Sequence, residues 1–153
     1  MNFIDFKKSI NKPADQVVFV GLGNKARGDD VAGLLFLREL KKRPEYQLSS
    51  FIEAATNPEN YLERILDFHP LLVVFVDAAN VGTTPGDMEW IDSGDLDTAR
   101  ISTHAFHISL VEHYLKIHQP LEVRYFGIRP ESTTIGRPVS DAVQQKIKMF
   151  FTQ

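Results

Sequence analysis

Short apolar segments alternate with polar segments along most of this chain. The first apolar run, 17–20 (VVFV), is followed by a glycine-rich stretch and then by an apolar-rich segment that begins at Val31. An unbroken run of β-branched and aromatic residues is typical of a buried strand. The segment after Val31 ends at basic residues and Pro44, which suit the C-terminal end of a helix. The pattern therefore predicts a strand, a glycine loop and a helix.

The same succession of strand and helix signals continues to the end of the chain. The run 71–76 (LLVVFV) is uninterrupted, as expected for a central parallel strand that is buried on both faces. Segment 92–100 is polar and is predicted to be a loop. The remaining predicted elements are strands at 47–53, 87–91 and 121–127, and helices that begin at Asn57, at Ser102-Thr103-His104 and at Ser140 or Asp141.

This order of elements predicts the α/β class. We expect a single-domain, three-layer fold, in which a mostly parallel, twisted sheet of five strands carries helices on both faces. A chain of 153 residues suits one such domain. Residues 1–15 precede the first strand, and the sequence leaves open whether they form a short docking helix or a partly ordered arm. We therefore predict an N-terminal arm at 1–15 and a domain at 16–153.

The composition excludes several classes of function. The net charge is −3 and no basic block is present, so we expect no nucleic-acid partner. No apolar run approaches the roughly 18 residues of a membrane span, and we expect neither a membrane partner nor a secretory signal. The absence of cysteine excludes disulfides, thiolate nucleophiles and cysteine-based zinc sites. These features fit a cytoplasmic protein.

Polar residues that follow the predicted strands are the first candidates for a functional site. In open α/β sheets, ligands bind at the carboxyl ends of the strands, and Asp29, Asp30 and Asp77 come at such ends. One aspartate of the adjacent pair could cap the following helix, which would leave the other for a site. Asp77 directly follows an apolar run, and a buried carboxylate costs free energy unless it is paired or bound to a cation. An Asx turn that begins at Asp77 is the alternative explanation.

A histidine supplies the third candidate. His104 lies at the predicted start of a helix, where the helix dipole disfavours the imidazolium and leaves a neutral nitrogen available to a metal. His107, one helical turn later, competes for this role, whereas the other histidines of the chain are interpreted as structural. Two carboxylates and one histidine at the same sheet edge would form a divalent-metal site with open positions, which suits nickel, zinc or manganese.

Two other chemistries remain open at this point. Residues Gly21–Ala26 match the pattern G-x-G-x-x-A after a strand, and Glu53 closes the next strand where a ribose-binding acid would lie. A dinucleotide bound there would, however, meet two carboxylates at its pyrophosphate. Asp30 and Asp77 could instead share a proton as an aspartic dyad, although a histidine beside them favours the ionised forms. A G-x-S-x-G nucleophile elbow does not occur in the sequence.

Several short motifs occur in a fixed order between the first strand and the last. They are Gly23-Asn24, Gly28-Asp29-Asp30, Val76-Asp77-Ala78, Ser102-Thr103-His104 and Gly127-Ile128-Arg129-Pro130. With this ordered set the chain resembles the hydrogenase maturation endopeptidases, which process the large subunit of nickel–iron hydrogenases. That family usually has glycine after the second acid of the second motif, where this chain has Val31.

The resemblance implies a five-stranded α/β sheet and an endopeptidase. Such an enzyme removes the C-terminal extension of the nickel–iron hydrogenase large-subunit precursor once nickel has been inserted. Carried over to this chain, Asp30, Asp77 and His104 would be the catalytic and metal-contacting residues. The metal would be nickel carried by the precursor, and zinc or another divalent ion would be able to substitute for it.

Other residues take supporting roles in this interpretation. Asn24 would order the glycine loop, and Glu53 and His107 would support the metal-contacting residues. Two alternative functions stay open. One is a dinucleotide- or nucleotide-binding Rossmann-like domain, and the other is a non-catalytic module that docks a metalloenzyme precursor.

Overall fold

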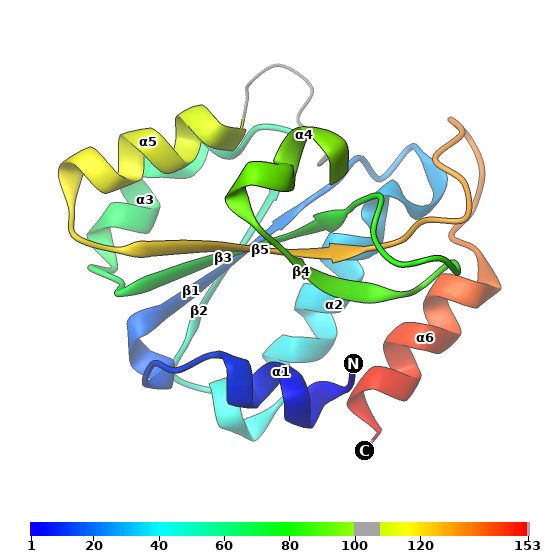
Figure 1. The fold of residues 1–153 in the computed structure, drawn as a ribbon, viewed down its shortest axis with the longest axis horizontal. Helices are drawn as coiled ribbons and strands as arrows, with labels where there is room; N and C mark the ends of the chain where they lie inside the picture. Colours follow the sequence, from blue (N-terminus) through cyan, green and yellow to red (C-terminus); the bar gives the residue numbers. More distant parts are fainter. Residues whose placement is uncertain (100–107, 153) are drawn as a thin grey trace.

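The computed structural model describes residues 1–99 and 108–152. Five strands form one sheet in the order β2-β1-β3-β5-β4, in which β4 is antiparallel to β5 and the other neighbours are parallel (Figure 1). The predicted α/β class with a mostly parallel, five-stranded sheet is confirmed. The strands are β1 (Val17–Leu22), β2 (Ser50–Ala55), β3 (Leu72–Ala78), β4 (Met88–Ile91) and β5 (Glu122–Ile128).

Helices cover both faces of the sheet, as Figure 1 shows. One buried apolar cluster joins the sheet to α1, α2 and α6, and a second cluster joins its other face to α3, α4 and α5. In the part of the chain that the structure describes, no helix is long and apolar enough to cross a membrane. The helices are α1 (Phe3–Ser9), α2 (Ala32–Lys41), α3 (Leu62–Asp67), α4 (Leu96–Ala99), α5 (Ile108–His118) and α6 (Asp141–Phe151). Short 3-10 helices are η1 (Ala14–Gln16), η2 (Gly28–Val31), η3 (Pro44–Tyr46), η4 (Pro58–Tyr61) and η5 (Ser93–Asp95).

The central strand β3 is buried on both faces. Val76 belongs to the cluster under α2 and α6, whereas its neighbour Phe75 belongs to the cluster on the opposite face. Successive residues of a strand point to opposite faces, which explains why residues 72–76 of β3 are all apolar. The register places Val76 beside Gly21 of β1 and Asp77 beside Gly127 of β5.

The segment that precedes β1 forms a helix that packs into the core. In α1, Phe3 and Phe6 are both buried. The ring centroid of Phe6 lies 4.9 Å from that of Phe126 in β5 and 5.8 Å from that of Phe150 in α6. The structure thus resolves the choice between a helix and a partly ordered arm, which the sequence left open. The division between an arm at 1–15 and a domain at 16–153 stays a prediction.

Local differences from the sequence prediction occur at α4 and η4. The segment 92–100, predicted to be a polar loop, contains the short helix α4, because Leu96 and Ala99 are buried in the second apolar cluster. Leu96 and Ala99 are the apolar residues of an otherwise polar segment, and two such residues are too few to predict a helix from the sequence. The helix predicted at Asn57 starts with the 3-10 turn η4, and the Asn57 side chain makes no cap hydrogen bond there.

Replacing Phe6 by alanine tests whether α1 is integral to the fold. Loss of this buried ring is expected to lower the free energy of unfolding by about 3–5 kcal/mol, because it leaves a cavity among its aromatic neighbours. Denaturant unfolding measures the change. Ile4→Ala is the matched control in the same helix, since Ile4 is 42% exposed, and it should change the free energy by less than about 0.5 kcal/mol. Equal stability of Phe6→Ala and the unmodified protein would show that α1 lies outside the cooperative unit.

Candidate functional site

The first turn of α2 lies directly against the carboxyl ends of β1 and β3. At Gly33 a Cβ atom would lie 2.3 Å from the carbonyl oxygen of Val76 and 2.7 Å from that of Leu22. A side chain at this position would force the backbone apart, so glycine allows the helix to contact the strand ends. Asp30 lies just before this contact, in η2, and Asp77 directly follows Val76. The contact therefore brings both aspartates to the same corner of the sheet.

Asp30 is held by the glycine loop that precedes it. The residue is 4% exposed, and its Oδ2 accepts a hydrogen bond from the backbone N–H of Asn24 at 2.9 Å. Asn24 orders the loop, as expected, because its Oδ1 accepts a hydrogen bond from the N–H of Ala26 at 2.9 Å. Gly23 has a φ of 142°, and a Cβ there would lie 2.1 Å from the carbonyl oxygen of Asp30. Only glycine permits this close return of the loop.

Asp77 is the second aspartate at this corner. It is 1% exposed, and its Oδ1 accepts a hydrogen bond from the N–H of Ala78 at 2.8 Å. The loop after β3 is held by Arg129, whose Nη1 donates to Asn80 Oδ1 at 2.9 Å and to the carbonyl oxygen of Val81 at 3.1 Å. Arg129 belongs to the last motif that the sequence analysis singled out. Its physical role is to order the chain that follows Asp77.

Asp29 has a different role from its neighbour Asp30. It is 1% exposed, and its carboxylate accepts hydrogen bonds from the N–H and the hydroxyl of Ser140, both at 2.7 Å, and from the N–H of Glu131 at 2.8 Å. Asp29 thereby holds the loop that leads into α6. The expectation that one aspartate of the pair caps α2 is wrong, because the chain passes through η2 first and the N-cap of α2 is Val31.

The third predicted metal-contacting residue, His104, lies outside the described residues, as does its competitor His107. Within the two stretches that the structure does describe, no group of three or more histidines, aspartates or glutamates could hold a metal ion. The roles of these histidines therefore stay predictions. The corner of the sheet that carries Asp30 and Asp77 is the part of the candidate site that the structure places.

Glu53 lies at the outer edge of the sheet, where it pairs with Arg38 of α2. The Arg38 guanidinium donates to both carboxylate oxygens of Glu53, at 2.8 and 3.4 Å. These hydrogen bonds, with the charge of Arg38, hold the pKa of Glu53 below its ordinary value. The structure thus pairs Glu53 with Arg38, whereas the sequence suggested a ribose-binding or metal-supporting role. Since Asp30 already accepts the N–H of Asn24, the geometry gives no support to a dinucleotide site on the glycine loop.

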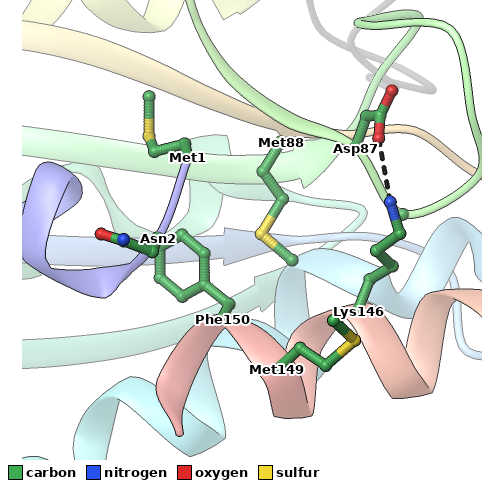
Figure 2. Close-up of a pocket in the computed structure, with 8 residues that line it drawn as sticks. Met1, Asn2, Asp87, Met88, Lys146, Met149 and Phe150 are labelled. Carbon is green, nitrogen blue, oxygen red and sulfur yellow. Dashed lines mark hydrogen bonds and ion pairs between the residues drawn. The ribbon is translucent and has the colours of Figure 1, made fainter. Parts of the chain in front are cut away.

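A separate hollow of about 220 Å³ lies between the N-terminus, β4 and α6 (Figure 2). All three methionines of the chain line it, together with Asp87, which accepts a hydrogen bond from Lys146 Nζ at 3.2 Å. Asp87 also accepts the backbone N–H groups of Thr83 and Thr84. These backbone hydrogen bonds, with a smaller effect of Lys146, lower the pKa of Asp87 to about 2. Neither candidate aspartate lines this hollow.

Comparison with known proteins identifies the family of this chain. The family model for hydrogenase maturation protease matches residues 36–153. The chain belongs to the hydrogenase maturation protease family. The hydrogenase 3 maturation protease of Escherichia coli is 29% identical over 132 residues, which are 83% of either protein. A putative hydrogenase maturation protease of Methanocaldococcus jannaschii is 24% identical over 140 residues, covering 87% of this chain and 82% of that protein.

Solved structures of hydrogenase maturation proteases have the same fold. The crystal structure of the [NiFe] hydrogenase maturation protease HycI from Thermococcus kodakarensis superposes with a TM-score of 0.77 at 28% identity, over 95% of this chain and 92% of that chain. The solution structure of the endopeptidase HycI from Escherichia coli gives 0.72 at 26% identity, over 87% of this chain and 85% of that chain. As a member of this family, the chain is a peptidase.

The family resemblance assigns a site role to Asp30, but no local sequence pattern predicts what its neighbour Asp29 binds. The sequence predicts either Ser140 or Asp141 as the N-cap of the last helix, and the structure shows that it is Ser140. Besides its cap hydrogen bond, Ser140 donates hydrogen bonds to Asp29, which lies 111 residues earlier in the chain. No local signal links positions so far apart, so the role of Asp29 in holding the loop before α6 emerges only from the fold.

Replacing Asp29 by alanine is expected to destabilise this maturation protease strongly. The change removes the buried carboxylate that accepts hydrogen bonds from Ser140 and Glu131, which should cost roughly 3 kcal/mol or more of unfolding free energy. Denaturant unfolding measures this loss. Ser140→Ala removes the hydroxyl alone, including its cap hydrogen bond, and should cost only about 1 kcal/mol. An Asp29→Ala protein that is no less stable than Ser140→Ala would contradict the role assigned to the carboxylate.

The lowered pKa of Asp87 predicts a pH-dependent stability. The ordinary value is 3.8 and the folded value about 2, so the carboxylate stabilises the fold above pH 3.8, and this contribution disappears as the pH falls through about 2. Asp87→Asn should therefore be less stable than the unmodified protein at neutral pH, and the difference in denaturation midpoint should shrink in acid. Lys146→Met keeps the backbone donors and should change the midpoint less. If the midpoints of Asp87→Asn and the unmodified protein differ by the same amount at all pH values, the lowered pKa of Asp87 is contradicted.

Proposed function

We propose that this peptidase removes a C-terminal extension from the large-subunit precursor of a nickel–iron hydrogenase after nickel has been inserted. Family membership and the similar proteins, which are named as hydrogenase maturation proteases, support this class of substrate. In the proposal, nickel belongs to the precursor, and the enzyme detects it before cutting.

The observation that carries the proposal is the pair of buried aspartates at one corner of the sheet. Asp30 and Asp77 come from different elements and are only 4% and 1% exposed. The contact at Gly33 holds the elements together. Two carboxylates at one buried corner concentrate negative charge, which favours a divalent cation at that place. The cation of the proposal is the nickel ion that the precursor presents.

His104 completes the proposed set of contacts with a nitrogen ligand. Carboxylate oxygens and a histidine nitrogen suit nickel, and also zinc or another divalent ion in its place. Contact with the metal would align the C-terminal segment of the precursor at the sheet edge, where the metal would polarise the carbonyl of the bond to be cut. A precursor without metal lacks the group that Asp30 and Asp77 contact, so cleavage would follow metal insertion.

A cleavage assay on purified precursor tests this function. The nickel-loaded precursor should be cut and the metal-free precursor should not, with the released peptide measured by mass spectrometry. Asp30→Asn, Asp77→Asn and His104→Ala should each slow cleavage by roughly 100-fold or more, because each removes a group that acts at the reacting centre. Circular dichroism should show that the variants remain folded.

Glu131→Gln provides the matched control, since this exposed acid lies on a neighbouring loop and its side chain takes no part in the proposed contacts. It should cut at the unmodified rate. Normal cleavage by Asp77→Asn would refute the assignment of that residue. Binding of the nickel-loaded precursor without any cleavage by the unmodified protein would support a docking module in place of a peptidase acting on this substrate.

A further inference from the structure

The outer edge of the sheet beside β2 carries a hollow that the proposed catalytic corner does not use. Its volume is about 230 Å³. Because α2 covers one face of the sheet and α3 the other, a hollow that touches both helices and β2 lies at the margin of the sheet. Residues that line it are Arg38 and Lys41 of α2, Phe51 and Glu53 of β2, Tyr61 of η4 and Arg64 of α3.

β2 is a terminal strand of the sheet. Among the described residues it pairs with β1 alone. A parallel terminal strand presents a row of backbone N–H and C=O groups on its outer side, and such a row is able to pair with an added strand. Many recognition domains bind an extended peptide in this way, with main-chain hydrogen bonds for affinity and flanking side chains for selectivity.

The margin beside β2 is basic, although the chain as a whole has a net charge of −3. Arg38 is neutralised by its pair with Glu53. Lys41 and Arg64 line the same hollow from opposite faces of the sheet, both are exposed, and neither forms a salt bridge with another described residue. Two cations that flank one strand edge without a salt bridge to a described residue are complementary to an acidic chain lying along it.

The edge of β2 leads directly to the corner that carries the aspartates. The carbonyl oxygen of Ala55, the last residue of β2, accepts a hydrogen bond from the N–H of Gly23 at 2.9 Å. Gly23 in turn lies against the carbonyl of Asp30. A peptide that follows β2 toward its carboxyl end therefore arrives at the loop that holds Asp30.

We propose that the outer edge of β2 is a docking groove for an extended acidic segment of the hydrogenase precursor. This inference rests on the proposed function, which supplies the partner. The segment adds a strand to the sheet beside β2, its carboxylates meet Lys41 and Arg64, and its apolar side chains lie against Phe51. Because side chains of a strand alternate between faces, acidic residues on both faces of the segment reach the two cations.

A different explanation of the same charges is protection against aggregation, since basic residues at a sheet edge prevent association with other chains. The two explanations differ in what the cations do during catalysis. Docking requires that they lower the KM for the precursor, whereas edge protection leaves KM unchanged and affects only solubility.

The double variant Lys41→Glu/Arg64→Glu distinguishes these explanations. With nickel-loaded precursor, KM should rise by roughly 10-fold and kcat should stay near the unmodified value, because the changed charges act on binding remote from the reacting bond. Lys41→Gln/Arg64→Gln should raise KM by less. Lys8→Glu is the matched control, since Lys8 is exposed on α1 and lines none of the hollows described above, and it should leave KM unchanged.

Hydrogen exchange supplies a readout that does not depend on cleavage. Amides of residues 50–55 should exchange more slowly when the unmodified enzyme is saturated with precursor, because a new strand covers the outer edge of β2. If the double variant cuts the precursor with an unchanged KM, the docking groove is overturned. If the unmodified enzyme cuts the precursor but its β2 amides are not protected, the groove is overturned as well. Either result leaves the peptidase function intact. Protection of β2 in an enzyme that binds the precursor but does not cut it would support the groove and refute the proposed function.

Discussion

The approach of the first turn of α2 to the ends of β1 and β3 is the constraint on which the candidate site depends. At Gly33 the helix backbone is in contact with the carbonyl oxygens of Val76 and Leu22. A side chain there would displace the helix from the sheet and with it the turn that carries Asp30. The shared position of Asp30 and Asp77 is therefore a consequence of backbone packing, and neither aspartate creates it.

The segment that follows β5 supports both aspartates of the corner. Arg129 donates hydrogen bonds to the loop after β3, which follows Asp77 in the chain. Asp29 binds the backbone of Glu131 and Ser140, and thereby joins the turn that carries Asp30 to the start of α6. The positions of Asp30 and Asp77 thus both depend on the segment that connects β5 to α6, so a change in that segment would affect both aspartates.

Much of the fold follows from local sequence. The uninterrupted run 71–76 predicts a central strand, and the structure shows it buried on both faces because its side chains enter both apolar clusters. The helix α4 and the role of Asp29 escape prediction. In each of these cases the deciding contacts are with residues far away in the chain: Leu96 packs under other elements, and Asp29 binds Ser140. The placement of Asp30 and Asp77 at one edge was predictable, since parallel strands bring their carboxyl ends together, whereas His104 lies outside the described residues.

The packing of α1 has a consequence for synthesis of the protein. α1 is translated before the sheet, and although Phe6 also contacts Phe19 and Phe36, two of its ring partners, Phe126 in β5 and Phe150 in α6, are translated long after it. Until then the surface against which Phe3 and Phe6 pack is incomplete, because the contacts with β5 and α6 are missing. This face of the sheet therefore closes only after α6 has been translated. Throughout that interval part of the apolar side of α1 is uncovered, and transiently exposed apolar surface of this kind makes a folding chain prone to aggregation.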